Sequence, residues 1–150
     1  MVRKGFTLVE LMIVILIVAI LAAVAIPLMT GRIDAAKWSE GKASMGTIAT
    51  AIRAYYAEKG CNPAPPAPSL VPTDPGFIGV TANDLTGTYF TSNCYAIAAG
   101  LTGCDAATGQ VFFSITCTGT DSTRVGHPTT PGSVTLSQAA GAQSIFVDHP

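Results

Sequence analysis

The N-terminal part of the chain contains one continuous apolar segment. Residues 6–26 have the sequence FTLVELMIVILIVAILAAVAI, in which Glu10 is the only charged residue. A helix of this length, rising about 1.5 Å per residue, crosses the roughly 30 Å hydrocarbon core of a bilayer. Arg3 and Lys4 precede the segment, and the next basic residue is Arg32. We therefore expect a membrane-spanning helix with a cytoplasmic N-terminus and an exported remainder.

A second apolar pattern, with helical spacing, follows in residues 27–60. It consists of three positions at heptad spacing and three more that lie one helical turn further on: Trp38, Met45, Ile52, Gly41, Ile48 and Tyr55. Residues spaced in this way lie on one face of a helix. We expect the helix to continue to about Gly60, a C-terminal stop, and to pack this stripe on the protein's own sheet. Pro27, with Gly31 nearby, predicts a kink.

The composition changes at residues 61–76, CNPAPPAPSLVPTDPG, which indicates an extended proline-rich connector. Residues 77–150 are rich in Gly, Thr and Ser and form a predicted β-rich head. We predict strands at four places, namely residues 88–92, 94–99, 111–117 and 144–147. The expected fold is α+β: a long N-terminal helix, membrane-spanning in its first half and amphipathic in its second, packed against a small antiparallel sheet.

Charge and motifs exclude several classes of function. Charged residues make up 11% of the chain, and the formal net charge is −1, with no basic patch of the kind that binds nucleic acid. Both histidines, His127 and His149, lie beside prolines, and no catalytic motif is present. Asp105, Asp121 and Asp148 lack the spacing of a calcium loop. We expect a protein that is not an enzyme and that carries no metal or other cofactor.

The cysteines all lie on the side that we expect to be exported. An even number in an oxidising compartment predicts two disulfides among Cys61, Cys94, Cys104 and Cys117. Three connectivities are possible. We favour Cys94 with Cys104, which closes a short loop between strands, and Cys61 with Cys117, which pins the connector to the sheet. A zinc site that uses these cysteines and His127 is disfavoured because no C-x-x-C pair is present.

Glu10 is the feature of the apolar segment that needs an explanation. An ionised carboxylate costs about 2.5–3.5 kcal/mol at the middle of such a helix and less near its edge, so we expect a positively charged partner on another copy. One other interpretation is a removable signal peptide cleaved after the A-x-A site at residues 23–25, although the apolar run is too long for one and contains an acid. Another is a plain membrane anchor on which Glu10 is merely tolerated.

The sequence KGFTLVELMIVILIVAILAAVAIP resembles the N-terminal signature of type IV pilins and their pseudopilin relatives. This resemblance implies that residues 1–5 are a leader, cleaved by a prepilin peptidase between Gly5 and Phe6, and that the new amine of Phe6 is N-methylated. It also implies that Glu10 is the assembly glutamate, and that the helix loosens near Pro27. The mature subunits would polymerise into a helical filament whose core is formed by residues 6–26.

The leading interpretation is therefore a structural subunit of a type IV pilus with a role in adhesion, motility or another surface function. Its expected partners are copies of itself, the prepilin peptidase and the pilus assembly machinery. Its expected location is the inner membrane before assembly and an extracellular filament afterwards. One alternative is a pseudopilin of a type II secretion system, against which Asp74 and Pro75 are followed by Gly76 and Phe77 and not by a W-G-x-P-Y-like segment. A second is a DNA-uptake pilin, although the head lacks a basic patch. A membrane-anchored enzyme or binding module has no supporting motif.

Overall fold

The computed structural model describes residues 5–61, 70, 73, 76–119 and 124–150. Within it the chain divides into two compact units, Met1–Ile33 and Asp34–Pro150. Arg3 and Lys4 lie outside the described residues, as does most of the predicted connector at residues 61–76.

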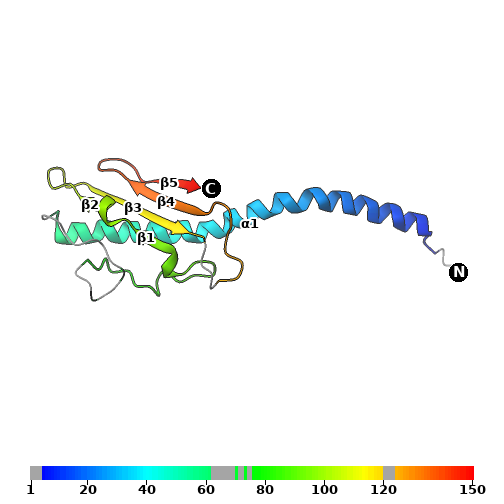
Figure 1. Ribbon diagram of the computed structural model, residues 1–150, viewed down its shortest axis with the longest axis horizontal. Helices are drawn as coiled ribbons and strands as arrows, with labels where there is room; N and C mark the ends of the chain where they lie inside the picture. Colours follow the sequence, from blue (N-terminus) through cyan, green and yellow to red (C-terminus); the bar gives the residue numbers. More distant parts are fainter. Residues whose placement is uncertain (1–4, 62–69, 71–72, 74–75, 120–123) are drawn as a thin grey trace. The chain divides into compact units, whose positions relative to one another are not determined.

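Helix α1 (Leu8–Lys59) contains both predicted helical segments (Figure 1). It ends at Gly60, which has φ 73° and whose N–H donates to the carbonyl of Tyr56 at 2.9 Å. Glycine adopts this left-handed conformation readily because it has no Cβ, so the predicted stop is confirmed. The helical conformation continues through Pro27 and Gly31. The kink expected there stays a prediction.

The apolar stripe of α1 forms part of the core of the unit Asp34–Pro150. All six predicted stripe residues are buried, and Trp38 is only 2% exposed. The five of them other than Gly41 pack in one cluster with buried side chains of the sheet and of the segment before it, including Phe90, Phe113 and Ile115. Gly41 allows a close approach, because a Cβ there would lie 3.1 Å from Cζ of Phe90. The expected packing of the stripe on the protein's own sheet is confirmed.

The sheet is antiparallel throughout. Its strands are β1 (Tyr95–Ile97), β2 (Gly103–Cys104), β3 (Val111–Thr118), β4 (Ser133–Gln138) and β5 (Ile145–His149). The order is β1-β3-β4-β5, and β2 pairs with β3 beside this path. Figure 1 shows the sheet alongside the second half of α1. The predicted α+β fold, a long helix with a small antiparallel sheet, is confirmed.

The strand predictions differ from the structure in three places, one of which is the short strand β2, which was not predicted. Residues 88–92 form no strand, because Phe90 is buried in the core and its N–H and that of Tyr89 donate to Oε1 of Glu40, at 3.2 and 3.0 Å. These amides bond a helix side chain instead of a neighbouring strand. Strand β4 was not predicted, although buried Val134 and Leu136 alternate with polar residues, as expected of a strand with one buried face.

The predicted disulfide pairing is wrong. Cys61 is bonded to Cys104, with their Cα atoms 5.1 Å apart, whereas Cys94 and Cys117 are buried free thiols. The reason is the position of Cys117, whose Sγ would lie 3.4 Å from a Cβ on Gly41. Cys61 follows the end of α1, roughly 27 Å further along the helix axis. Cys104 lies elsewhere in the sheet, in β2, where it is the strand neighbour of Val111 at the start of β3.

Candidate functional site

The start of α1 is capped by two residues that are hydrogen-bonded to each other, Thr7 and Glu10. Oε2 of Glu10 accepts hydrogen bonds from the N–H of Thr7 at 2.9 Å and from its hydroxyl at 2.8 Å. In return, Oγ1 of Thr7 accepts from the N–H of Glu10 at 3.2 Å. This reciprocal arrangement is a capping box, which satisfies backbone donors that a helix start leaves unpaired. The role was not predicted, although the T-x-x-E pattern at residues 7–10 is the signal for it.

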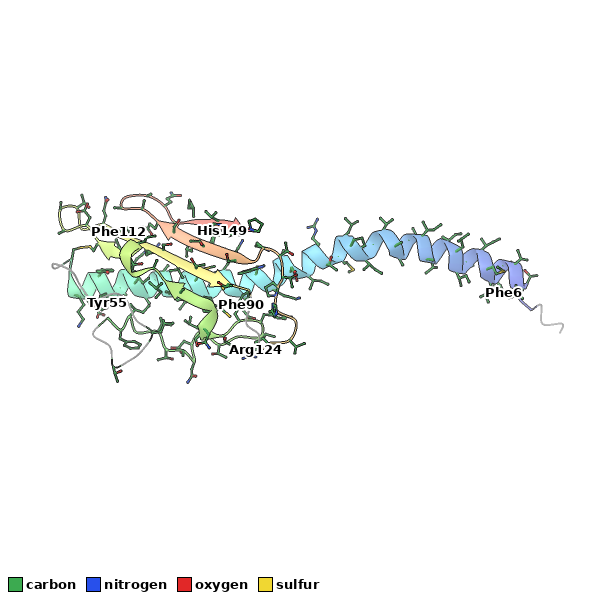
Figure 2. All side chains as sticks on the ribbon, viewed as in Figure 1. Phe6, Tyr55, Phe90, Phe112, Arg124 and His149 are labelled. Carbon is green, nitrogen blue, oxygen red and sulfur yellow. A yellow bond between two sulfur atoms is a disulfide. The ribbon has the colours of Figure 1, made fainter. Side chains whose placement is uncertain are left out.

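The residues implied in processing lie immediately before this cap. Gly5 and Phe6 precede the first helical residue, and the side chain of Phe6 is 83% exposed (Figure 2). Within residues 5–61, Glu10 forms no ion pair, because its carboxylate bonds only Thr7. The structure thus brings Gly5, Phe6 and Glu10 together at one helix start, where none of the described residues pairs a cation with Glu10.

The remainder of this helical segment presents apolar side chains in every direction. An 18-residue window of α1 has a mean hydropathy of 3.2, and none of it is buried within the described chain. Val9, Met12, Ile13 and Leu16 line a shallow apolar hollow on its surface. A helix that is apolar all round is stable only when lipid or other helices cover it. By length and composition, α1 is able to cross a membrane.

The other predicted site residues are distributed differently. Pro27 and Gly31 lie within α1, in the same unit as Glu10, whereas all four cysteines belong to the unit Asp34–Pro150. Burial raises the pKa of the Cys117 thiol to about 12, which disfavours a reactive thiolate. Among the residues that the structure describes, no group of three His, Cys, Asp or Glu side chains is placed to hold a metal ion.

Carboxylates of α1 hold loops of the head in place. Oδ2 of Asp34 accepts hydrogen bonds from the N–H and the hydroxyl of Thr129, both at 3.1 Å, and Oδ1 lies 3.1 Å from Nζ of Lys37. The hydrogen bond from the Thr129 backbone, followed by the contacts of Lys37 and the Thr129 hydroxyl, lowers the pKa of Asp34. Glu40 accepts hydrogen bonds from the N–H groups of Tyr89 and Phe90, and so holds the segment before β1 against the helix. These contacts connect distant parts of the sequence and stabilise the fold.

Comparisons with known proteins also find similarity in the N-terminal segment that contains this helix start. Residues 1–26 match the family described as "Prokaryotic N-terminal methylation motif". The chain is 46% identical over 63 residues to fimbrial protein EcpC of Eikenella corrodens, an alignment that covers 42% of this chain and 41% of that protein. It is 45% identical over 57 residues to the type IV major pilin protein PilA of Myxococcus xanthus, covering 38% of this chain and 26% of that one.

A third relative comes from a secretion system. The chain is 37% identical over 62 residues to the type II secretion system core protein G of Pseudomonas aeruginosa, covering 41% of this chain and 44% of that protein. The chain thus spans less than half the length of each of these three relatives. No solved structure matches. The resemblance to type IV pilins and their pseudopilin relatives is confirmed, and the N-terminal methylation motif is its most specific part.

Proposed function

We propose that this protein is a structural, non-enzymatic subunit of a type IV pilus, which polymerises through the first part of α1 into an extracellular filament. The observation that carries the proposal is the helix start, where an exposed apolar helix begins with a capped carboxylate that forms no ion pair with any described residue. The match of residues 1–26 to the N-terminal methylation motif supports the same function. The curated relatives include fimbrial proteins and type IV major pilins.

The first step of the proposed mechanism is processing. A prepilin peptidase cleaves between Gly5 and Phe6, which creates a positively charged amine on Phe6, and N-methylation keeps that charge. The site is accessible, because both residues precede the helix and are exposed. Cleavage also removes Arg3 and Lys4, the basic residues that hold the N-terminus in the cytoplasm.

The second step is docking of the mature subunit. The amine of Phe6 on one copy meets Glu10 of a neighbouring copy, so each charge neutralises the other as the apolar helices pack together. Desolvation penalises both charges when they are separate, and breaking such a pair leaves one of them uncompensated. The hydrogen bonds from Thr7 hold the carboxylate of Glu10 while the subunit is still alone in the inner membrane.

The third step uses the same apolar surface in two environments. Lipid covers the side chains of residues 6–26 before assembly, and the helices of neighbouring subunits cover them in the filament. Pro27 and Gly31 lie just beyond this segment, and we propose that the helix loosens there during assembly. The partners are therefore copies of this chain, the prepilin peptidase and the assembly machinery.

A second candidate function is that of a pseudopilin in a type II secretion system. The similarity to core protein G favours it, since that match covers 41% of this chain, close to the 42% covered by the match to EcpC. The described part of the head has no cluster of basic residues, so a DNA-uptake role has no comparable support.

The test is N-terminal peptide mass spectrometry on two fractions of the native cells: filaments sheared from the surface, and the cell envelope. A chain that begins at N-methylated Phe6 in the sheared fraction supports the pilus subunit. The same processed chain confined to the envelope, with a secretion defect when it is deleted, indicates the pseudopilin. A chain that begins at Ile26 means cleavage by signal peptidase, which overturns both.

A further inference from the structure

The outward face of strands β3 and β4 consists almost entirely of hydroxyl side chains. Alternate residues of a strand point to opposite sides of a sheet, and Ile115, Cys117, Val134 and Leu136 point into the core. The residues between and beside them therefore point away from it. They are Ser114, Thr116 and Thr118 of β3 and Ser133, Thr135 and Ser137 of β4, which we call the hydroxyl face.

The strand register arranges these side chains in pairs. Ser114 lies opposite Ser137, Thr116 opposite Thr135, and Thr118 opposite Ser133, so each cross-strand pair joins two hydroxyl residues. The hydroxyl oxygens of Thr116 and Thr135 are 3.2 Å apart. Neighbouring strands are about 4.8 Å apart, and alternate residues of a strand are about 6.8 Å apart. The hydroxyl face is thus a regular array with two columns of three.

Among the described residues, the strand neighbours of this array on the same side of the sheet carry no Asp, Glu, Lys or Arg. Ala96 of β1 lies opposite Thr116, and on β5 Ile145 lies opposite Ser137, Val147 opposite Thr135 and His149 opposite Ser133. Asp148 lies opposite buried Val134, on the other side of the sheet, where it pairs with Lys42. Apart from the imidazole of His149 at one end, an ionic ligand would find no ionisable side chain among these residues, whereas neutral hydroxyl groups would find both donors and acceptors.

One end of the hydroxyl face opens into a hollow of about 400 Å³. Apolar side chains, among them Phe112, Leu101 and Ala139, line it together with Ser114 and Ser137. Leu101 is 62% exposed, and Phe112 lies where β2 pairs with β3 (Figure 2). The Phe112 ring packs on Gly103, where a Cβ would come within 2.7 Å of Cζ of the ring.

We propose that the hydroxyl face and its hollow bind a neutral polysaccharide. A sugar ring combines apolar C–H faces, which pack on Phe112 and Leu101, with hydroxyl groups, which bond the array. The volume of the hollow lies within the roughly 300–1,000 Å³ typical of small-molecule sites. This inference goes beyond the proposed function and does not depend on assembly. A filament would nevertheless present the site in many copies and strengthen weak binding through multivalency.

The test measures saccharide binding to the full-length protein in lipid nanodiscs. The probes are neutral gluco-, manno- and galacto-oligosaccharides, with an acidic oligogalacturonate for comparison. Their binding is measured by saturation-transfer NMR and by titration. The double variant Thr135→Val, Ser137→Ala removes two hydroxyls and keeps the shape of the surface nearly unchanged. We expect it to bind at least about tenfold more weakly than the wild type, because each lost hydrogen bond weakens binding severalfold.

A matched control is Thr47→Val, Thr50→Val, which removes two exposed hydroxyls from the helix. It should bind as the wild type does, and circular dichroism should show all three proteins equally folded. No binding of any neutral probe, equal binding by the hydroxyl-face variant, or a preference for the acidic probe would overturn the proposal. Self-association that the same variant abolishes, seen by sedimentation, would assign the hydroxyl face to a second copy of this chain and overturn it as well.

Discussion

The substitution Glu10→Gln separates the capping role of Glu10, which the structure shows, from its proposed role in charge pairing. Glutamine serves at the third helical position of a capping box as glutamate does, so the hydrogen bonds with Thr7 can be kept while the charge is lost. We expect insertion, cleavage and the helix start to remain intact. The mature subunit, however, would bring the amine of its neighbour into an apolar interface without a partner.

The size of the effect follows from that uncompensated charge. Removing one partner of a buried ion pair costs about 3–5 kcal/mol. Since each 1.4 kcal/mol is about a factor of ten, the equilibrium for adding a subunit should fall at least about 100-fold. The assay compares the pilin in sheared filaments with the processed pilin that remains in the membrane, by quantitative immunoblot, and checks processing by N-terminal mass.

The matched control is Thr7→Val, which removes the capping hydroxyl and leaves the charge of Glu10. Loss of an N-cap costs about 1 kcal/mol, an effect on the helix start that is much smaller than loss of the charge pair. We expect this variant to assemble far better than Glu10→Gln. If Glu10→Gln forms filaments as abundantly as the wild type, the charge-pairing mechanism is wrong. If Thr7→Val is the more defective variant, capping and not charge is the main contribution of Glu10.

Three further predictions concern the unit Asp34–Pro150 and use the fluorescence of Trp38, the single tryptophan, to follow unfolding in the full-length protein in micelles. Ile48→Ala, at a fully buried site, should lower the free energy of unfolding by about 2–5 kcal/mol, whereas Thr47→Ala, at an exposed one, should change it by less than about 0.5 kcal/mol. Asp34→Asn should destabilise the unit most near neutral pH, because a carboxyl whose pKa is lowered by folding contributes stability above its unfolded pKa and loses it as the pH falls through its folded pKa. The difference in free energy of unfolding from the wild type should therefore narrow below about pH 4. A difference that does not depend on pH would contradict this. Cys104→Ser should remove about 4 kcal/mol, the chain-entropy value for a sequence separation of 43, and non-reducing peptide mapping of the wild type should link Cys104 to Cys61 and not to Cys94.

The helix was predictable because its two patterns are strong and local. Continuous hydrophobicity marks residues 6–26, a repeating stripe marks residues 38–55, and Gly60 supplies the stop, and none of these depends on distant parts of the chain. The head was less predictable because its segments compete for partners. The amides of Tyr89 and Phe90 bond Glu40, far away in sequence, and local propensity for a strand does not reveal such a contact. Disulfide connectivity depends on the register of β2 and β3, which the spacing of cysteines does not determine.

Glu10 illustrates why a site can be identified from sequence while half of its chemistry is missed. An acid in an apolar helix draws attention to its charge, and the charge calls for a distant cation. The structure shows that its nearest partner is Thr7, three residues away, through bonds that require no second molecule. In the proposed mechanism, such a local partner would hold the carboxylate while the subunit is in the bilayer and before a neighbour arrives. The same carboxylate thus bonds Thr7 and, in the proposed mechanism, also pairs with the amine of a neighbour. Thr7→Val tests the first interaction, and Glu10→Gln tests the second.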